Sequence, residues 1–171
     1  MTDGIGAATA KTEARTRAGL LALSLAICYL AAAIGSFFTG LSVNGWYQSL
    51  AKPPITPPGW VIGAIWTVLY LLMAISLFLV LEKDRSLPQV REGLSLFAVQ
   101  LSLNITWSVL FFGLRSPLLA LAGVLLLWAA IAATILWFMK ISRPAAYLLV
   151  PYLLWVSFAT VLNAWILILN P

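Results

Sequence analysis

The chain of 171 residues contains no histidine, a single cysteine and few charged side chains. Histidine is the commonest protein ligand for metal ions and is also a frequent ligand of haem iron, so its absence argues against such centres. One cysteine, Cys28, allows neither an internal disulfide bond nor a cysteine metal cluster. Only 9% of the residues are charged, whereas soluble domains have about 25%. These absences exclude an ordinary soluble domain, and the 63% hydrophobic content indicates an integral membrane protein.

Long apolar runs fill most of the chain. Five of them stand between charged or proline-containing breaks, at residues 19–38, 60–81, 93–114, 117–139 and 145–169. Each run is long enough for an α-helix to cross a hydrocarbon core of about 30 Å. Strands of a membrane β-barrel would be about ten residues long with strict alternation, a pattern that the sequence lacks. We therefore predict an all-α integral membrane protein: one five-helix transmembrane bundle over residues 18–171, preceded by a polar tail at residues 1–17.

The first run has two interpretations, because Lys11, Arg15 and Arg17 precede it in the manner of a cleavable signal sequence. Its apolar character continues beyond Ala33 to Phe38, which gives a full spanning length and favours a retained helix.

Basic residues are distributed unevenly between the two ends of the predicted bundle. Eight of the ten lysines and arginines lie in the N-terminal tail and in the second and fourth connections, whereas Lys52 and Arg115 lie in the first and third. The positive-inside rule then predicts a cytoplasmic N-terminus and an outer C-terminus in a bacterial cell membrane. The net charge of +5 reflects these anchoring residues, and no separate basic domain is present to bind nucleic acid.

Aromatic and amide side chains recur on three of the runs at spacings of three and four residues, which place them on one face of a helix. The three stripes are Ile62, Trp66, Tyr70 and Met73; Gln100, Asn104, Trp107 and Phe111; and Tyr152, Trp155, Ala159 and Asn163. One interpretation is that the amides only join helices while the aromatics fill space. The other is that three such faces converge in the single interior of a bundle and line an apolar pocket with a few polar groups, the usual form of a small-molecule site.

Small residues at four-residue spacing allow helices to approach closely. Ala22 and Ala26, Ala31 and Gly35, and the Ala129 to Ala133 cluster follow this pattern. They fit internal packing and a homodimer interface equally well.

The first connection carries four prolines, in Pro53-Pro54 and Pro57-Pro58, which exclude a helix from about residue 52 to 58 and stiffen the chain. Trp46, Tyr47 and Trp60 beside it suit the membrane–water boundary. A stiff loop of this kind is either a lid over the bundle or an interfacial anchor.

Three groups of motifs occur in order along the chain: Trp46-Tyr47, Leu50, Lys52-Pro53, Pro57-Pro58, Trp66, Leu69-Tyr70 and Met73; then Gln100, Asn104, Trp107 and Phe111-Phe112; then Pro151-Tyr152, Trp155, Phe158-Ala159 and Leu162-Asn163. Over roughly residues 20–170 they resemble the tryptophan-rich sensory protein family, which includes the mitochondrial translocator protein.

The resemblance implies an often dimeric five-helix bundle that binds porphyrins such as protoporphyrin IX, and sterol-like or benzodiazepine-type ligands, beneath the first loop. By motif position the pocket would be lined by Tyr47, Pro57, Ile62, Trp66, Tyr70, Asn104, Trp107, Trp155, Ala159 and Asn163. It implies no required cofactor and no metal. Two departures concern ligand choice: Ile55 stands where the family loop commonly has tryptophan, and no basic residue follows Arg143 to complete a sterol-recognition pattern.

The leading hypothesis is a membrane receptor or sensor for porphyrins and related hydrophobic ligands. Light-dependent porphyrin degradation, with Trp66 and Trp155 as the reactive pair, is its enzymatic variant, although the spans offer no ordinary general acid, base or nucleophile. A transporter of porphyrin or lipid is an alternative, against which stand the lack of an evident inverted repeat and of ionisable residues within the spans. A scaffold that binds other proteins and no small molecule is the third hypothesis.

Overall fold

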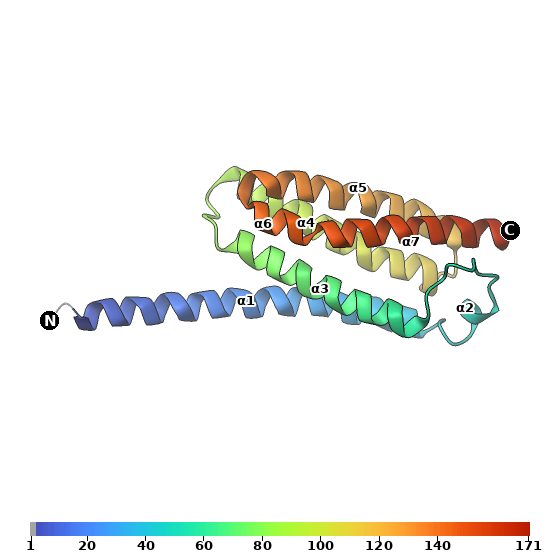
Figure 1. Cartoon of the computed structure of the whole chain (residues 1–171), viewed down its shortest axis with the longest axis horizontal. Helices are drawn as coiled ribbons and strands as arrows, with labels where there is room; N and C mark the ends of the chain where they lie inside the picture. Colours follow the sequence, from blue (N-terminus) through green and yellow to red (C-terminus); the bar gives the residue numbers. More distant parts are fainter. Residues whose placement is uncertain (1–2) are drawn as a thin grey trace.

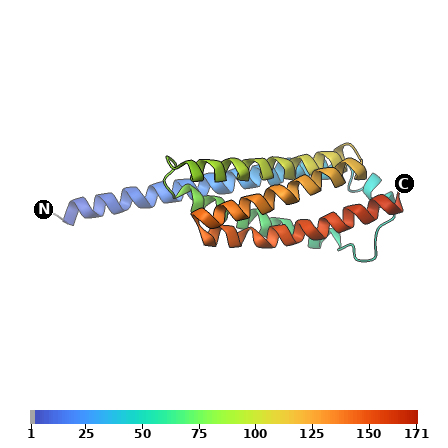
Figure 2. The same cartoon turned by 90° about the horizontal axis from the view of Figure 1, so that it is seen from above.

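The computed structural model describes residues 3–171, with side chains from Glu13 onward. Within that part of the chain all regular elements are helices, and they run along the length of an elongated bundle (Figures 1 and 2). The long ones are α1 (Asp3–Gly40), α3 (Gly59–Leu81), α4 (Pro88–Ser108), α5 (Pro117–Ile141) and α7 (Val150–Leu169), joined by short α2 (Trp46–Ser49), α6 (Arg143–Leu148) and the π-helix η1 (Val109–Gly113). Five helical segments are long and apolar enough to cross a membrane. The predicted all-α bundle with five transmembrane helices is confirmed.

Two helix boundaries differ from the predicted runs because of a proline residue. The third span begins at Pro88 rather than residue 93, because proline at the first helical position needs no hydrogen-bond partner. The fifth span is divided between α6 and α7 after Leu149, since Pro151 has no N–H to continue the hydrogen-bond ladder. At the other end of the chain, the backbone of the predicted polar tail is helical from Asp3 and continuous with the first span.

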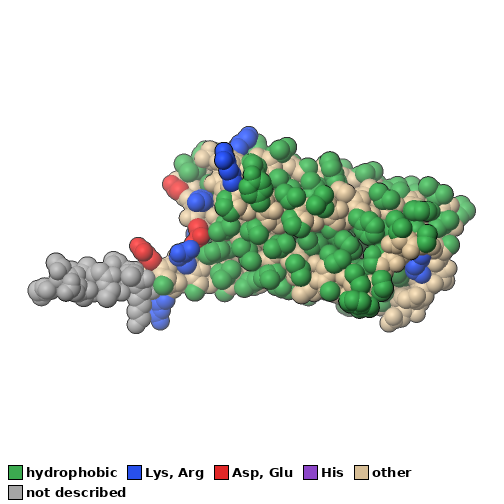
Figure 3. Space-filling model, viewed as in Figure 1, with side chains coloured by type: hydrophobic (Ala, Val, Ile, Leu, Met, Phe, Trp, Pro, Cys, Tyr) green, Lys and Arg blue, Asp and Glu red, His purple; other side chains and the backbone are tan. Residues whose placement is uncertain are grey.

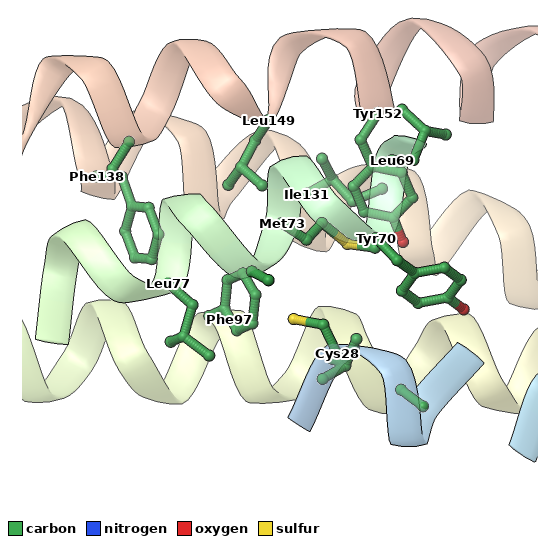
Figure 4. Close-up of a cluster of buried hydrophobic side chains, with 14 of the residues drawn as sticks. Cys28, Leu69, Tyr70, Met73, Leu77, Phe97, Ile131, Phe138, Leu149 and Tyr152 are labelled. Atoms are coloured by element: carbon green, nitrogen blue, oxygen red, sulfur yellow. The ribbon is translucent and has the colours of Figure 1, made fainter. Parts of the chain in front are cut away.

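The core of the bundle is a column of buried apolar side chains from every long helix (Figure 4). Cys28 of α1, Met73 of α3 and Ile131 of α5 are fully buried. Phe97 of α4 stacks on Phe138 of α5, with ring centroids 6.0 Å apart and the planes 2° from parallel. The outer surface is also largely apolar, as expected for helices that face lipid (Figure 3).

Close helix contacts depend on small residues. A Cβ atom added at Gly93 would lie 2.8 Å from Cδ1 of Ile141, so glycine lets α4 approach α5. Gly35 of α1 similarly faces Ser108 of α4, where an added Cβ would lie 3.3 Å from the hydroxyl oxygen. The Ala31 and Gly35 pair therefore packs internally, whereas Ala22 and Ala26 lie on the exposed side of α1.

Charged side chains gather at the end of the bundle that holds the α3–α4 connection (Figure 3). There Arg17 of α1 pairs with Glu82 at the end of α3, with Nε and Oε1 2.5 Å apart. In the same connection the backbone N–H of Ser86 donates to Asp84 Oδ1 at 2.9 Å. Hydrogen bonds from Ser86 lower the pKa of the Asp84 carboxyl. The opposite end carries the proline-rich connection.

Candidate ligand-binding site

A cavity of about 490 Å³ lies inside the bundle at the end covered by the α1–α3 connection. Nine of the ten predicted site residues line it: Tyr47, Ile62, Trp66, Tyr70, Asn104, Trp107, Trp155, Ala159 and Asn163. The tenth, Pro57, lies in the connection outside the lining. The three aromatic and amide stripes thus meet in one interior space, while Gln100, Met73 and Tyr152 at their deeper ends are buried in the core below it.

Aromatic rings form much of the cavity wall. Trp107 stacks on Phe111, with centroids 5.5 Å apart and planes at 28°. Trp66 packs against Tyr70 of its own helix at 5.7 Å. Phe111 belongs to η1, where the wider π-helical turn carries both it and Phe112 into the lining. Such offset and edge contacts give a rigid apolar surface suited to a flat ligand.

A polar bridge across three helices closes the bottom of the cavity. The hydroxyl of Tyr70 in α3 donates to Asn104 Oδ1 at 2.5 Å, and Asn104 Nδ2 in α4 donates to the hydroxyl oxygen of Tyr152 in α7 at 2.8 Å. The side chain of Asn104 is 2% exposed, so both ends of its amide are satisfied inside the protein. Asn104 therefore joins helices, as the first interpretation of the stripes has it.

Asn163 is engaged in the same way. Its Oδ1 accepts from Nε1 of Trp107 at 3.2 Å, and its Nδ2 donates to the carbonyl of Pro117 at 2.8 Å. This pairing fixes the Trp107 indole against the cavity wall. Both amides and the N–H of Trp107 are thus already engaged in hydrogen bonds within the protein.

Trp155 is different, because its indole Nε1 is buried and has no hydrogen-bond partner. Among the described residues, only Gln100 shares this property, through both atoms of its amide. Gln100 is fully buried below the cavity, whereas Trp155 lines it. A buried donor without a partner costs free energy, so an acceptor that reached Nε1 of Trp155 would be favoured.

Helix α1 supplies a side of the cavity that the sequence patterns missed. Its lining residues are Tyr29, Ala32, Gly35, Ser36, Thr39 and Gly40. The first run has no stripe of aromatics and amides, so that pattern does not predict its contribution to the cavity. The relevant signal is the repeat of small residues, because short side chains on one face leave space rather than fill it. Tyr29 also donates its hydroxyl to the carbonyl of Thr67 at 3.3 Å, which links α1 to α3.

The proline-rich connection is non-helical from residue 51 to 58, as predicted, and is attached at several points. Asn170, after α7, exchanges two hydrogen bonds with the backbone of Ala51. Lys52 donates to the carbonyls of Gln48 and Leu50 and lies 4.8 Å from the centroid of the Tyr47 ring. Burial raises the pKa of Tyr47, so the ring that lines the cavity carries a neutral phenol at neutral pH.

A second attachment lies on the α1 side of the connection. Ser42 donates its hydroxyl to the carbonyl of Phe112 in η1 at 2.6 Å, and Arg115 Nε donates to the Ser42 hydroxyl oxygen at 3.4 Å. The connection is therefore fastened to both Asn170 after α7 and the α4–α5 turn, and its residues Val43 and Tyr47 line the cavity.

Comparison with known proteins agrees with this architecture. The model of the TspO/MBR family matches residues 24–169. The tryptophan-rich protein TspO of Chlorobaculum tepidum is 45% identical over 151 residues, covering 88% of this chain and 96% of the relative. The protein of the same name from Archaeoglobus fulgidus is 43% identical over 80% of this chain and 87% of its own. The human translocator protein is 39% identical over 78% of this chain and 82% of its own. The chain is a multi-pass integral membrane protein that belongs to the TspO/MBR family.

Proposed function

We propose that the chain is a membrane receptor for porphyrins, with protoporphyrin IX as the representative ligand, and for related flat hydrophobic molecules. The observation that carries the proposal is a cavity lined by aromatic side chains, including Trp155, whose buried indole N–H has no hydrogen-bond partner. The cavity volume of about 490 Å³ falls in the range of small-molecule sites, roughly 300–1,000 Å³.

The chemistry of the wall matches such a ligand. Trp66, Trp107 and Phe111 offer ring faces on which a flat macrocycle can stack. Trp155 offers one hydrogen bond to a carbonyl or carboxylate oxygen. Stacking, shape and this hydrogen bond would together recognise the ligand.

The test is a titration of the purified protein in detergent with protoporphyrin IX in the dark, followed by quenching of tryptophan fluorescence. We expect saturable quenching with a dissociation constant in the low micromolar range, about −8 kcal/mol. Trp155→Phe should raise that constant about tenfold, because it removes one hydrogen bond to a polar or charged ligand group.

Trp128→Phe is the matched control. The Trp128 indole N–H donates to Ser157 at 2.8 Å on the outer side of the bundle, so its loss removes a tryptophan and a hydrogen bond but leaves the cavity intact. Quenching that rises linearly without saturation, and that neither variant alters, would mean partitioning into detergent. That result would refute the proposal and favour the scaffold.

Light-dependent degradation of the porphyrin is a second candidate activity. It is supported by the positions of Trp66 and Trp155, both of which line the cavity from different helices. The double variant Trp66→Phe with Trp155→Phe keeps aromatic bulk. Loss of porphyrin absorbance under light that continues unchanged in this variant, at matched ligand occupancy, would rule out the reactive pair.

We also propose an orientation of the protein in the membrane and a homodimeric assembly. Lys83, Arg85 and Arg91 lie at the end of the bundle with the Arg17–Glu82 pair, which the positive-inside rule places in the cytoplasm, so that the cavity mouth faces outward. A homodimer would use exposed helix surfaces such as the Ala22 and Ala26 side of α1. Labelling of introduced cysteines from each side of intact cells tests the orientation, and light scattering of the detergent complex tests the dimer.

A further inference from the structure

A second hollow lies on the outer surface of the bundle, between α3 and α7. It is an open groove of about 580 Å³ whose lining is wholly apolar: Ala64, Ile65, Val68, Leu69 and Leu72 from α3, and Pro151, Leu154, Trp155 and Phe158 from α7. Val68 and Leu154 are well exposed there, at 55% and 66%. Both helices span the membrane, so the groove faces lipid hydrocarbon.

Trp155 is the residue that lines both the outer groove and the interior cavity. On the α3–α7 side, it therefore lies between the bilayer and the candidate ligand site.

The Trp155 ring packs against the core but lacks the hydrogen bond that anchors three other indoles of the bundle. Trp107, Trp128 and Trp137 each donate their indole N–H to a partner: Asn163, Ser157 and the carbonyl of Gln89. Trp155 makes no such bond, and its recorded ring contact is with Phe158, another residue of the groove, at 5.5 Å. Rotation of the Trp155 ring therefore breaks no hydrogen bond.

Helices α3 and α7 themselves have few close backbone contacts with each other. Helix α3 packs mainly against α1 and α6, while α7 packs mainly against α5. In Figure 1, α3 begins beside the proline-rich connection, apart from α7, and comes closer to the last span toward the α6 end of the bundle. On the aqueous side, by contrast, that connection is fastened by Asn170 and Ser42.

We propose that the groove between α3 and α7 takes up a hydrocarbon chain from the bilayer and is the lateral entrance to the interior cavity, with the Trp155 indole as its movable partition. The role as an entrance rests on the proposed binding function. A hydrophobic ligand dissolved in the membrane then reaches the cavity without crossing the aqueous loop.

The kinetic test uses the protein in lipid nanodiscs, with protoporphyrin IX as the probe and stopped-flow quenching in the dark. Ala64→Phe places a ring in the groove and leaves the cavity lining unchanged. We expect both the association and the dissociation rate constants to fall about tenfold, while their ratio stays within about twofold, because the obstacle raises the barrier between two unaltered states.

Two further variants make this result specific. Ala129→Phe adds the same bulk on the exposed side of α5, away from both hollows, and should leave the rates unchanged. Asn170→Ala loosens the connection and should also leave them unchanged. Faster exchange in Asn170→Ala together with normal rates in Ala64→Phe would show entry from the aqueous side and overturn the proposal.

A second measurement tests the groove without porphyrin. A failure of the groove proposal can then be distinguished from a failure of the proposed porphyrin-binding function. The protein is labelled with 5-fluorotryptophan, and the ¹⁹F resonances of Trp155 and Trp128 are assigned by substitution. Trp128 is 41% exposed and bonds to Ser157 of α7, so it reports direct lipid contact at a similar depth.

Lipids with a nitroxide on the acyl chain should broaden the Trp155 resonance at least as much as that of Trp128. Ala64→Phe should reduce the broadening of Trp155 alone, and Ala129→Phe should not. Broadening of Trp155 that is much weaker than that of Trp128, or that Ala64→Phe leaves unchanged, would mean that no lipid chain enters the groove and would overturn the proposal whatever the porphyrin titration shows.

Discussion

Asn170 holds the backbone of Ala51 from both sides: Ala51 N–H donates to Asn170 Oδ1 at 3.0 Å, and Asn170 Nδ2 donates to the Ala51 carbonyl at 2.9 Å. The two residues are separated by 119 positions in the chain. A single side chain after the last helix thereby fixes the start of the proline-rich connection. The Asn170 side chain bonds to Ala51 as a neighbouring backbone strand would. Both the oxygen and the nitrogen of its amide are required for this pair of hydrogen bonds.

Asn170→Leu should release this connection. Each hydrogen bond contributes about 0.5–1.5 kcal/mol, so hydrogen exchange of the Ala51 amide should accelerate by at least about fivefold. Mass spectrometry of peptides that cover residues 46–58 measures the exchange. Asn170→Asp keeps the acceptor and loses the donor, and should give an intermediate rate. Equal exchange in all three proteins would show that the prolines alone hold the connection.

Asn104→Leu should destabilise the bundle, because it leaves the hydroxyls of Tyr70 and Tyr152 without their shared partner in a buried site. We expect the free energy of unfolding to fall by about 1–3 kcal/mol. Thermal unfolding followed by circular dichroism measures the loss.

Tyr70→Phe is the comparison for this bridge, since it removes one bond and leaves the Asn104 to Tyr152 bond in place. It should cost less than Asn104→Leu. A cost for Tyr70→Phe equal to or above that of Asn104→Leu would contradict the bridge as the source of the effect.

Gly63→Leu should abolish porphyrin binding while leaving the fold intact. A Cβ atom at Gly63 meets no heavy atom within 4 Å, and the residue lines the cavity. There is therefore room for a side chain to start into the cavity, and the replacement of glycine in a helix stabilises by up to about 1 kcal/mol. Gly19→Leu is the control, because its Cβ is equally free but lies far from the cavity on α1. Normal binding in Gly63→Leu would place the ligand elsewhere.

Arg115→Gly should be more stable than Arg115→Ala by about 1–2 kcal/mol. Arg115 lies in the α4–α5 turn with φ of 52°, and it is the non-glycine residue with positive φ in the described chain. Both substitutions lose the contact with Ser42. The difference in stability between them therefore measures the free-energy cost of the positive φ angle at this position. Unfolding midpoints in detergent at one protein concentration provide the measurement, and equal midpoints would argue against strain in this turn.

The periodic spacing of residues predicts which side chains share the cavity, but not what each polar side chain does there. Spacing on the second, third and fifth runs was enough to bring Trp66, Trp107 and Trp155 to one cavity, because the interior of a bundle is shared. It could not decide between helix bridging and ligand binding for Asn104, since that choice depends on whether two tyrosine hydroxyls from other helices lie within reach.

Other features were missed because they leave no periodic signal. The π-helical turn that brings Phe112 into the lining depends on tertiary packing, and the contribution of α1 comes from the absence of bulk at Ala32 and Gly35. The free N–H of Trp155 could be found only by accounting for every buried donor.

Helix α5 reaches the cavity nowhere, although it packs against both α4 and α7. The helix that braces the bundle from behind is therefore separate from the four that surround the ligand space. Amino-acid changes along α5 therefore alter lipid contact and packing without adding or removing a side chain of the cavity wall, whereas changes on the inner faces of α1, α3, α4 and α7 alter the shape of the cavity directly. The outer fit to a membrane and the inner shape of the cavity can in this way change independently.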